Sequence, residues 1–493
     1  MKMLCYKYLI RIGIALSFAA FVFATDGTTT TYATEVEVPT DVRIIQVNGL
    51  DVSIDLEYAN QTWYSIRSLT TEIPNTFTMT NLPEYDIYLN GELVENDATV
   101  EITLEQLAPN IGIEFRLIDK VTGEEKHYFI RTLHAAFDLT VGDTSEDLVD
   151  GYYYFTQGNM MYKMDTAGNV VYYKRGNLQF TDFKPYEIDG ELYYSYLEDV
   201  DPSNYLEATG ESQAVIMNAN YEVVDTIPCL STANGIAENQ PLSSYDFIML
   251  DLGHYIISGN INKNVSNIPT DVDSDGTAFV TATVIQEIKD NELLFQWIST
   301  DYPEFYGLSV EGNDYASEEA QNYLHFNSID IDPTDDHFVL SFCNLDSVVK
   351  IDRETGEIIW ILGGIGDEFG LTEAQLFSRQ NYAKFSDEGV LTLYDNGTAN
   401  AQTRALQIVL DEDTKTVVDY VDYSILYKYT ESMGSASCID SDEGVYLMGW
   451  GSRSPDCNLF SEINFETGEV LFELYDVTED IGGATYRVYK YER

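Results

Sequence analysis

Apolar and polar residues alternate over short distances along most of this chain, and turn residues interrupt the alternation at short intervals. We find no long stretch with the 3.6-residue apolar period of a helix. Seven short segments near the N-terminus have the two-residue period of a β-strand, at residues 42–47, 52–56, 76–79, 87–89, 99–102, 111–117 and 127–132. That density of strands predicts a small N-terminal β-sandwich domain over residues 38–138.

From residue 139 onward the pattern has a longer period. Its unit is an apolar strand, a turn with Asp or Asn, and a second strand rich in Val, Ile and aromatic residues. The unit recurs at residues 164–173, 217–227, 285–297, 349–360, 410–421 and 463–472. Six copies with room for four strands each predict a six-bladed β-propeller over residues 139–493, in an all-β chain. A β-sandwich or jelly roll is the alternative.

The N-terminus has the pattern of a targeting segment. Residues 1–24 contain a basic start, an apolar run and a small-x-small cleavage site that ends at Ala24, so they resemble a signal peptide. Residues 25–37 resemble a linker. We therefore expect a secreted or extracytoplasmic protein, at the cell surface or in the periplasm. An uncleaved N-terminal anchor is the alternative, and it is the only membrane contact that the sequence suggests.

The charge narrows the range of partners. The chain has 83 acidic and 26 basic residues, a formal net charge of −57. Such a field repels polyanions, which excludes nucleic acid as a partner. It also opposes an anionic substrate, so an anion site needs local cations or N–H donors.

Metal and disulfide motifs are weak. Residues 271–275 imitate the start of a calcium loop, but Ala282 stands where the bidentate glutamate belongs, so a solvated acidic loop is favoured. Cys438 and Cys457 could bridge neighbouring strands, although the cysteine spacing matches no zinc or redox motif. We predict no cofactor and no metal site.

Three polar steps precede apolar strands in the propeller region. A propeller builds its sites on its axis from loops and inner strands of several blades, so we expect these steps to meet there. They are Ser244-Tyr245-Asp246-Phe247, His325-Phe326-Asn327-Ser328 and Gln380-Asn381-Tyr382-Ala383.

The order of these steps resembles the bacterial arylsulfotransferases that need no nucleotide sulfate donor. Where that family has His-Asp, His-x-Asn-Ser-Ile and Gln-His, this chain has Tyr245-Asp246, the step at His325, and Gln380-Asn381, and the family's arginine falls on Cys343. The resemblance implies a transferase without a cofactor that moves a sulfuryl group from a phenolic sulfate ester to a phenolic acceptor. In the family a histidine is the proposed covalent sulfuryl acceptor, and other histidines and the arginine bind the sulfate oxygens.

By this resemblance His325 is the predicted catalytic residue, either as nucleophile or as general base. Tyr245, Asn327, Cys343 and Asn381 are the predicted substrate-binding residues, with Tyr245 as a proton donor and the two amides as neutral donors to sulfate. Asn381 cannot form a stable sulfo-enzyme, and Cys343 has no fixed positive charge. The alternative function is a catalytically weak or inactive secreted propeller that binds a ligand, a glycan or a protein.

Overall fold

The computed structural model of the chain divides into two compact units, which are described separately. Unit 1 comprises Met1–Leu107 and Ile111–Leu133, and unit 2 comprises Ala108–Asn110 and His134–Arg493. The structure describes residues 42–492 except 48–49, 56–62, 67–73, 80–81, 90, 97, 104–112, 124, 133–138, 146–147, 167, 169, 201–209, 220, 426–427, 442, 453–457 and 477–484. The predicted signal peptide and linker lie outside these residues. Within them no helix has the length and apolar character to cross a membrane.

Unit 1 consists of two sheets around one apolar core. In hydrogen-bonded order the first sheet contains β2 (Leu50–Asp55), β1 (Val42–Val47), β4 (Asn75–Thr78) and β7 (Thr99–Ile102). The second contains β3 (Trp63–Ile66), β9 (Glu125–Thr132), β8 (Ile113–Asp119), β5 (Tyr85–Leu89) and β6 (Glu92–Val94). Phe77 of β4 and Phe115 of β8 lie in the same core, so the two sheets form a β-sandwich.

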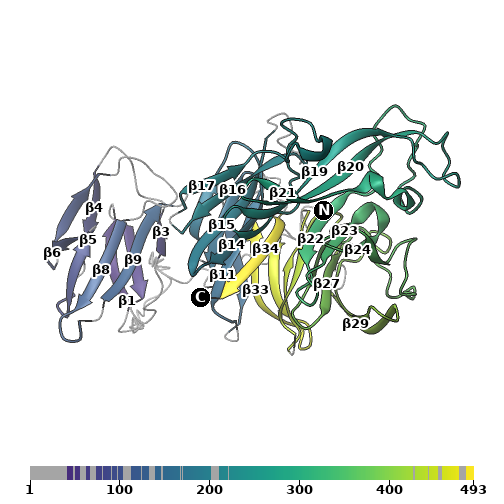
Figure 1. Ribbon diagram of the computed structural model, residues 1–493. Helices are drawn as coiled ribbons and strands as arrows, with labels where there is room; N and C mark the ends of the chain where they lie inside the picture. Colours follow the sequence, from purple (N-terminus) through teal and green to yellow (C-terminus); the bar gives the residue numbers. More distant parts are fainter. Residues whose placement is uncertain are drawn as a thin grey trace, which may run out of the picture. The chain divides into compact units, whose positions relative to one another are not determined.

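The described residues of unit 2 form six antiparallel sheets (Figure 1). From the inner strand outward, the first three are β34 (Thr485–Glu492), β11 (Gly151–Gln157), β12 (Met160–Asp165), β13 (Val170–Arg175); β14 (Phe180–Ile188), β15 (Glu191–Asp199), β16 (Ser212–Asn218), β17 (Val223–Ile227); and β18 (Ile248–Asp251), β19 (His254–Val265), β20 (Ala278–Lys289), β21 (Glu292–Ile298).

The other three sheets follow the same order. They are β22 (Phe326–Ile331), β23 (Phe338–Phe342), β24 (Ser347–Ile351), β25 (Ile358–Leu362); β26 (Asn381–Phe385), β27 (Val390–Asp395), β28 (Arg404–Asp411), β29 (Thr416–Ser424); and β30 (Ser435–Asp440), β31 (Val445–Gly449), β32 (Asn458–Asn464), β33 (Glu469–Asp476), β10 (Leu139–Thr144). Short 3-10 helices lie between strands at Ala233–Gly235, Ser299–Asp301, Pro303–Gly307 and Cys343–Leu345.

Hydrogen bonds join the inner strands, or the residues just before them, into a ring. The donors and acceptors are Thr181 Oγ1 to the Ser244 carbonyl (2.7 Å), Ile329 N to Asp246 Oδ2 (3.1 Å), Ala383 N to Ser328 Oγ (3.1 Å), Val488 N to Ser435 Oγ (3.2 Å), and the Tyr489 hydroxyl to the Asp182 carboxylate. Tyr394 of β27 and Ala436 of β30 share a core, which joins the remaining pair of sheets. The predicted all-β fold with a propeller is confirmed.

Strands from opposite ends of unit 2 close this ring. β34 pairs with β11 and completes the first sheet, and Figure 1 shows the yellow β34 beside the blue β11. β10 pairs with β33 at the outer edge of the last sheet. The first and last sheets therefore both contain strands that are distant in the sequence.

The six predicted repeat units correspond to the β12–β13, β16–β17, β20–β21, β24–β25, β28–β29 and β32–β33 hairpins. The polar residue in the turn stabilises the hairpin. In the fourth sheet Asp352 Oδ1 accepts the N–H groups of Glu354 (2.9 Å) and Thr355 (2.7 Å), and Gly356 takes the left-handed conformation with a φ of 77°. An Asp or Asn in the turn therefore marks the hairpin for a local reason.

Candidate functional site

The predicted site residues lie at the starts of consecutive inner strands. Tyr245 lies just before β18, His325 immediately precedes β22, and Asn381 begins β26. Inner strands of a propeller run in one direction along the axis, so these starts lie at the same end. Cys343 follows β23, which is antiparallel to β22, and its N–H donates to the His325 carbonyl (3.0 Å). Distant parts of the sequence therefore meet at this end.

Four of the five predicted residues form one cluster. The Tyr245 and His325 rings have centroids 5.4 Å apart. Asn327 lies close enough to the Cys343 thiol to lower its pKa, and the thiol in turn lies close enough to Tyr245 to raise the pKa of its phenol. All four residues are buried or half-buried.

Asn381 lies beside this cluster. The Asn327 Nδ2 donates to the Gln380 carbonyl (3.0 Å), which links β22 to the step that contains Asn381. The Asn381 amide itself donates to Asn396 Oδ1 (3.5 Å), on the residue that follows β27 of the same sheet. Asn381 therefore borders the cluster through the backbone of its neighbour.

The proton on His325 is positioned by Asn322. The His325 backbone N–H donates to Asn322 Oδ1 (3.0 Å), which fixes the orientation of the amide. Asn322 Nδ2 then lies 3.1 Å from His325 Nδ1. An amide NH₂ group can only donate, so Nδ1 accepts and the neutral imidazole has its proton on Nε2. In this state His325 presents an N–H donor and no free lone pair.

The backbone at His325 is strained. Its φ of 49° lies in the left-handed region, which costs a residue with a side chain about 1–2 kcal/mol. Tyr382, next to Asn381, has a φ of 50°. The Asn322 contacts help to hold His325 in this conformation.

The cluster is electrically neutral. Burial lowers the pKa of His325 below its usual range, so the imidazole is uncharged at neutral pH. Burial and the charge of Asp346 raise the pKa of Cys343 to about 12. Burial, together with the nearby Cys343 and Asp199, raises the pKa of Tyr245 to about 12. Thiol and phenol therefore both keep their protons and can act as donors.

Strand β34 supports the cluster from beneath. The Tyr486 hydroxyl donates to the Tyr245 carbonyl (2.8 Å), and Arg487 Nη2 donates to the Asn327 carbonyl (2.7 Å). Arg487 is fully buried, and its Nη1 lies 3.1 Å from Asp246 Oδ2. These contacts fix the backbone of two site residues.

A buried ionic network surrounds Arg487. Burial alone would raise the pKa of Asp246, but Arg487, Lys384 and Lys184 hold it well below its usual range. Lys184 Nζ also lies 2.9 Å from Asp182. The cations of this network are already paired with carboxylates.

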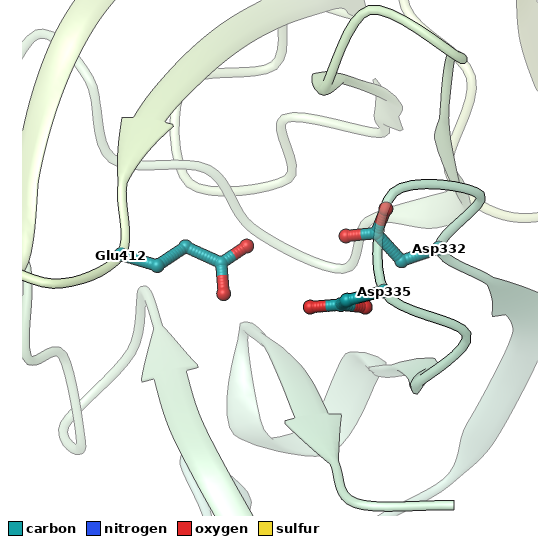
Figure 2. A group of neighbouring side chains, drawn as sticks. All are labelled: Asp332, Asp335 and Glu412. Atoms are coloured by element: carbon teal, nitrogen blue, oxygen red, sulfur yellow. The ribbon is translucent and has the colours of Figure 1, made fainter.

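Three carboxylates elsewhere in unit 2 lie close enough together to hold a metal ion, those of Asp332, Asp335 and Glu412. Figure 2 shows Glu412 directed toward Asp332 and Asp335. Lys350 Nζ lies 2.7 Å from Asp332, 2.7 Å from Asp335 and 2.8 Å from Glu412. Burial lowers the pKa of Lys350, but the three carboxylates raise it overall. The ammonium group therefore lies among the three carboxylates and offsets part of the charge that a metal ion would otherwise balance.

The structure also shows the calcium-like loop and one cysteine of the suggested Cys438–Cys457 bridge. Asp275 Oδ1, in the calcium-like loop, accepts the backbone N–H (3.0 Å) and the hydroxyl (2.6 Å) of Thr277. Cys438 has a free thiol, so the suggested bridge is not formed at that residue, and Cys457 lies outside the described residues.

Sequence reasoning missed four residues that define the site. Asn322, Asn344, Arg379 and Arg487 all contact predicted site residues or their neighbours. Asn322 has a local signal, because an Asn side chain commonly hydrogen-bonds a backbone group two or three residues away. Asn344 and Arg379 are sequence neighbours of Cys343 and of the Gln380-Asn381 step, but their mutual contact, and that of Arg487 with Asn327, depend on the folded chain.

Family comparison agrees with the order of the motifs. Residues 246–454 match the arylsulfotransferase (ASST) family model. The chain is arylsulfotransferase-like. The matched segment contains His325, Cys343 and Asn381, and it begins one residue after Tyr245. No curated protein matches this arylsulfotransferase-like chain.

Solved structures similar to the chain are distant. The dihydro-heme d1 dehydrogenase NirN has 10% identity over 67% of this chain and 56% of its own, with a TM-score of 0.31. A nidogen/laminin complex has 10% identity over 69% and 97%, with a TM-score of 0.37. The β-propeller domain of Cps50 (Swd1) from Myceliophteria thermophila has 11% identity over 69% and 100%, with a TM-score of 0.32. At these scores the similarities support no argument about function.

Proposed function

We propose that this arylsulfotransferase-like protein transfers a sulfuryl group from a phenolic sulfate ester directly to a phenolic acceptor. The main support is the family match across the segment that contains His325, Cys343 and Asn381. The adjacent rings of Tyr245 and His325 suit an aromatic substrate. The signal peptide expected at residues 1–24 adds to the proposal that the reaction occurs outside the cytoplasm.

Direct transfer fits the cluster better than a covalent intermediate. Asn381 is not a nucleophile, the Cys343 thiol is protonated, and the His325 Nδ1 lone pair is bonded to Asn322. In the direct reaction the bond from sulfur to the donor oxygen breaks, and a bond to the acceptor oxygen forms. The acceptor's phenolic proton ends on the departing phenolate, so protons and charges balance.

The chain's own role in this reaction is to donate hydrogen bonds. His325 Nε2–H and the Tyr245 hydroxyl can donate to the oxygens on which charge develops. A single donor of this kind contributes about 2.7–4 kcal/mol to lowering a barrier. The aromatic rings would orient the leaving group and the acceptor.

The test is an assay of the purified chain with 4-nitrophenyl sulfate, with and without phenol. We expect 4-nitrophenol release that depends on phenol, with phenyl sulfate detected by mass spectrometry. A stoichiometric burst of 4-nitrophenol without phenol would instead indicate a covalent sulfo-enzyme. Absence of phenyl sulfate under all conditions would reject sulfuryl transfer.

A second candidate is binding without turnover. The engaged Nδ1 of His325 and the neutral Cys343 favour it, because neither supplies a nucleophile or a cation. A protein of this kind would bind 4-nitrophenyl sulfate in equilibrium dialysis and release no 4-nitrophenol from it.

A further inference from the structure

Arg379 places a positive charge at the edge of the site. It directly precedes the Gln380-Asn381 step, and its backbone N–H donates to Asp346 Oδ1 (2.8 Å). Its Nη1 donates to Asn344 Oδ1 (2.7 Å), and its Nη2 forms an ion pair with Glu311. The Arg379 and Glu311 side chains are each 34% exposed. The guanidinium therefore lies where solutes can reach it.

Hydrogen bonds connect this guanidinium to the imidazole. Asn344 Oδ1, which accepts from Arg379, also accepts from the Cys343 thiol (3.5 Å). Asn344 Nδ2 donates to the Asn322 carbonyl (2.6 Å), and Asn322 Nδ2 donates to His325 Nδ1. Arg379 thus shares an acceptor with Cys343 and is joined to His325 through two asparagines.

Arg379 differs from the other cations near the site. Arg487 and Lys184 are buried beneath the cluster and are bonded to Asp182 and Asp246, which leaves them no freedom to meet a ligand. Arg379 has a partly exposed carboxylate partner instead. Partly exposed ion pairs are weak, so an incoming anion can replace that carboxylate at little cost.

We propose that Arg379 is the cation that binds the sulfate group of the donor, and that Glu311 occupies Arg379 until the anion displaces it. The inference rests on the proposed function for the identity of the anion, a sulfate monoester. A planar guanidinium suits such a group because it donates two parallel hydrogen bonds. The chain has a net charge of −57, which already opposes the approach of anions. Because an anion must also displace Glu311 from Arg379, anions that bind weakly would be excluded.

The experiment measures the Kd of 4-nitrophenyl sulfate by calorimetry at pH 7.5 and low salt. Inorganic sulfate and 4-nitrophenol are parallel ligands that separate the contributions of the anion and the ring. The variants are Arg379→Gln, Glu311→Gln and the double variant. Arg116→Gln is the matched control, because Arg116 forms a comparable ion pair with Glu125 in unit 1 (3.4 Å).

We expect Arg379→Gln to raise the Kd about tenfold or more, as the loss of a charge-assisted hydrogen bond would. Glu311→Gln should lower the Kd several-fold. In the double variant Glu311→Gln should no longer lower the Kd, because Glu311 competes with the ligand only when Arg379 is present. Arg116→Gln and the affinity for 4-nitrophenol should not change. Arg379→Lys, which retains the charge, should recover part of the affinity.

Three results would overturn the inference. They are a Kd unaffected by Arg379→Gln, a Kd unchanged or raised by Glu311→Gln, and no measurable binding to the wild-type chain. Binding that follows the expected pattern without any sulfuryl transfer would leave the anion site standing and reject the proposed reaction. Circular dichroism of each variant verifies that the fold is intact.

Discussion

Replacing Asn322 with aspartate should reverse the position of the proton on His325. In the wild type the amide oxygen accepts the His325 backbone N–H, and the amide nitrogen donates to Nδ1. The introduced carboxylate would be nearly isosteric with the amide, and its first oxygen could keep the backbone contact. Its second oxygen can only accept at pH 7, so Nδ1 would hold the proton and Nε2 would present a lone pair.

The size of the effect follows from the charge that Asn322→Asp introduces. The wild-type pKa of His325 is lowered by burial. An opposite charge in direct contact raises a pKa by about 1–3 units, and each unit corresponds to about 1.36 kcal/mol. The imidazolium should therefore gain about 1.4–4 kcal/mol relative to the neutral ring. Relative to the wild type, this gain in stability is fully present below the lowered wild-type pKa of His325, and it is lost as pH rises through the higher pKa of the variant.

The assay is NMR of the imidazole nitrogens, in which long-range proton–nitrogen correlations distinguish the two tautomers. His325 is assigned among the five histidines by its loss in His325→Gln. We expect an Nε2–H ring in the wild type, and an Nδ1–H ring with a higher pKa in Asn322→Asp. Asn313→Asp adds the same charge to the preceding loop and is the control.

Two results would refute this reasoning. One is a wild-type ring with its proton on Nδ1, and the other is a pKa of His325 that does not rise in Asn322→Asp. If the tautomer reverses as expected, sulfuryl transfer in this variant can use Nε2 as a base, and a burst of 4-nitrophenol without acceptor would show that it can also act as a nucleophile.

His325→Ala should lower aryl-sulfate turnover by about 10²–10³-fold, as the loss of one preorganised donor does. The control variant His337→Ala should leave turnover unchanged, and equal rates for the two variants in the 4-nitrophenol assay would contradict the role of His325. Asn381→His with Cys343→Arg should raise turnover by supplying a nucleophile and a cation, and a folded, inert double variant of an inert wild type would favour the binding function. Burial raises the pKa of Asp346 to about 6, so the native state binds the extra proton and stability falls as pH rises from about 4 to 6. Asp346→Asn should flatten that slope and stabilise the chain at pH 7 by about 1–2 kcal/mol, after allowance for partial exposure. Urea unfolding at about pH 4 and about pH 6 measures the slope, and an unchanged slope in Asp346→Asn would contradict this assignment.

The sequence predicted the elements whose causes are local. The seven strands predicted in unit 1 correspond to β1, β2, β4, β5, β7, β8 and β9, because alternation and turn residues mark them within a few residues. The short β3 and β6 were missed. β6 has three residues at the edge of its sheet, and β3 pairs in parallel with the distant β9, so neither has a strong local pattern.

In the propeller, too, the sequence predicted the elements that have a local cause. In four of its outer hairpins an Asp or Asn in the turn accepts nearby backbone N–H groups, and this chemistry appears in the sequence; these residues are Asn218, Asp352, Asp411 and Asn464. The pairing of β34 with β11 has no local signature, because only the closed ring brings these strands together.

The residues of the candidate site also differ in whether the local sequence reveals them. Tyr245, His325 and Asn381 could be found because each lies just before an inner strand or at its start, and their functional roles stay predictions. Arg379 and Arg487 could not be found in this way. Their importance depends on which amide or carbonyl lies opposite their side chains, and that is a property of the assembled ring.

Strand β34 also determines when the site can assemble. The N–H and O–H groups that hold the Tyr245 and Asn327 carbonyls both come from this strand, which is synthesised after every other described strand. Until it emerges, β11 is an unpaired edge, and such an edge favours association between chains. The ring of unit 2 therefore cannot close before β34 has been synthesised, and a nascent chain without it has an open ring and an unsupported site.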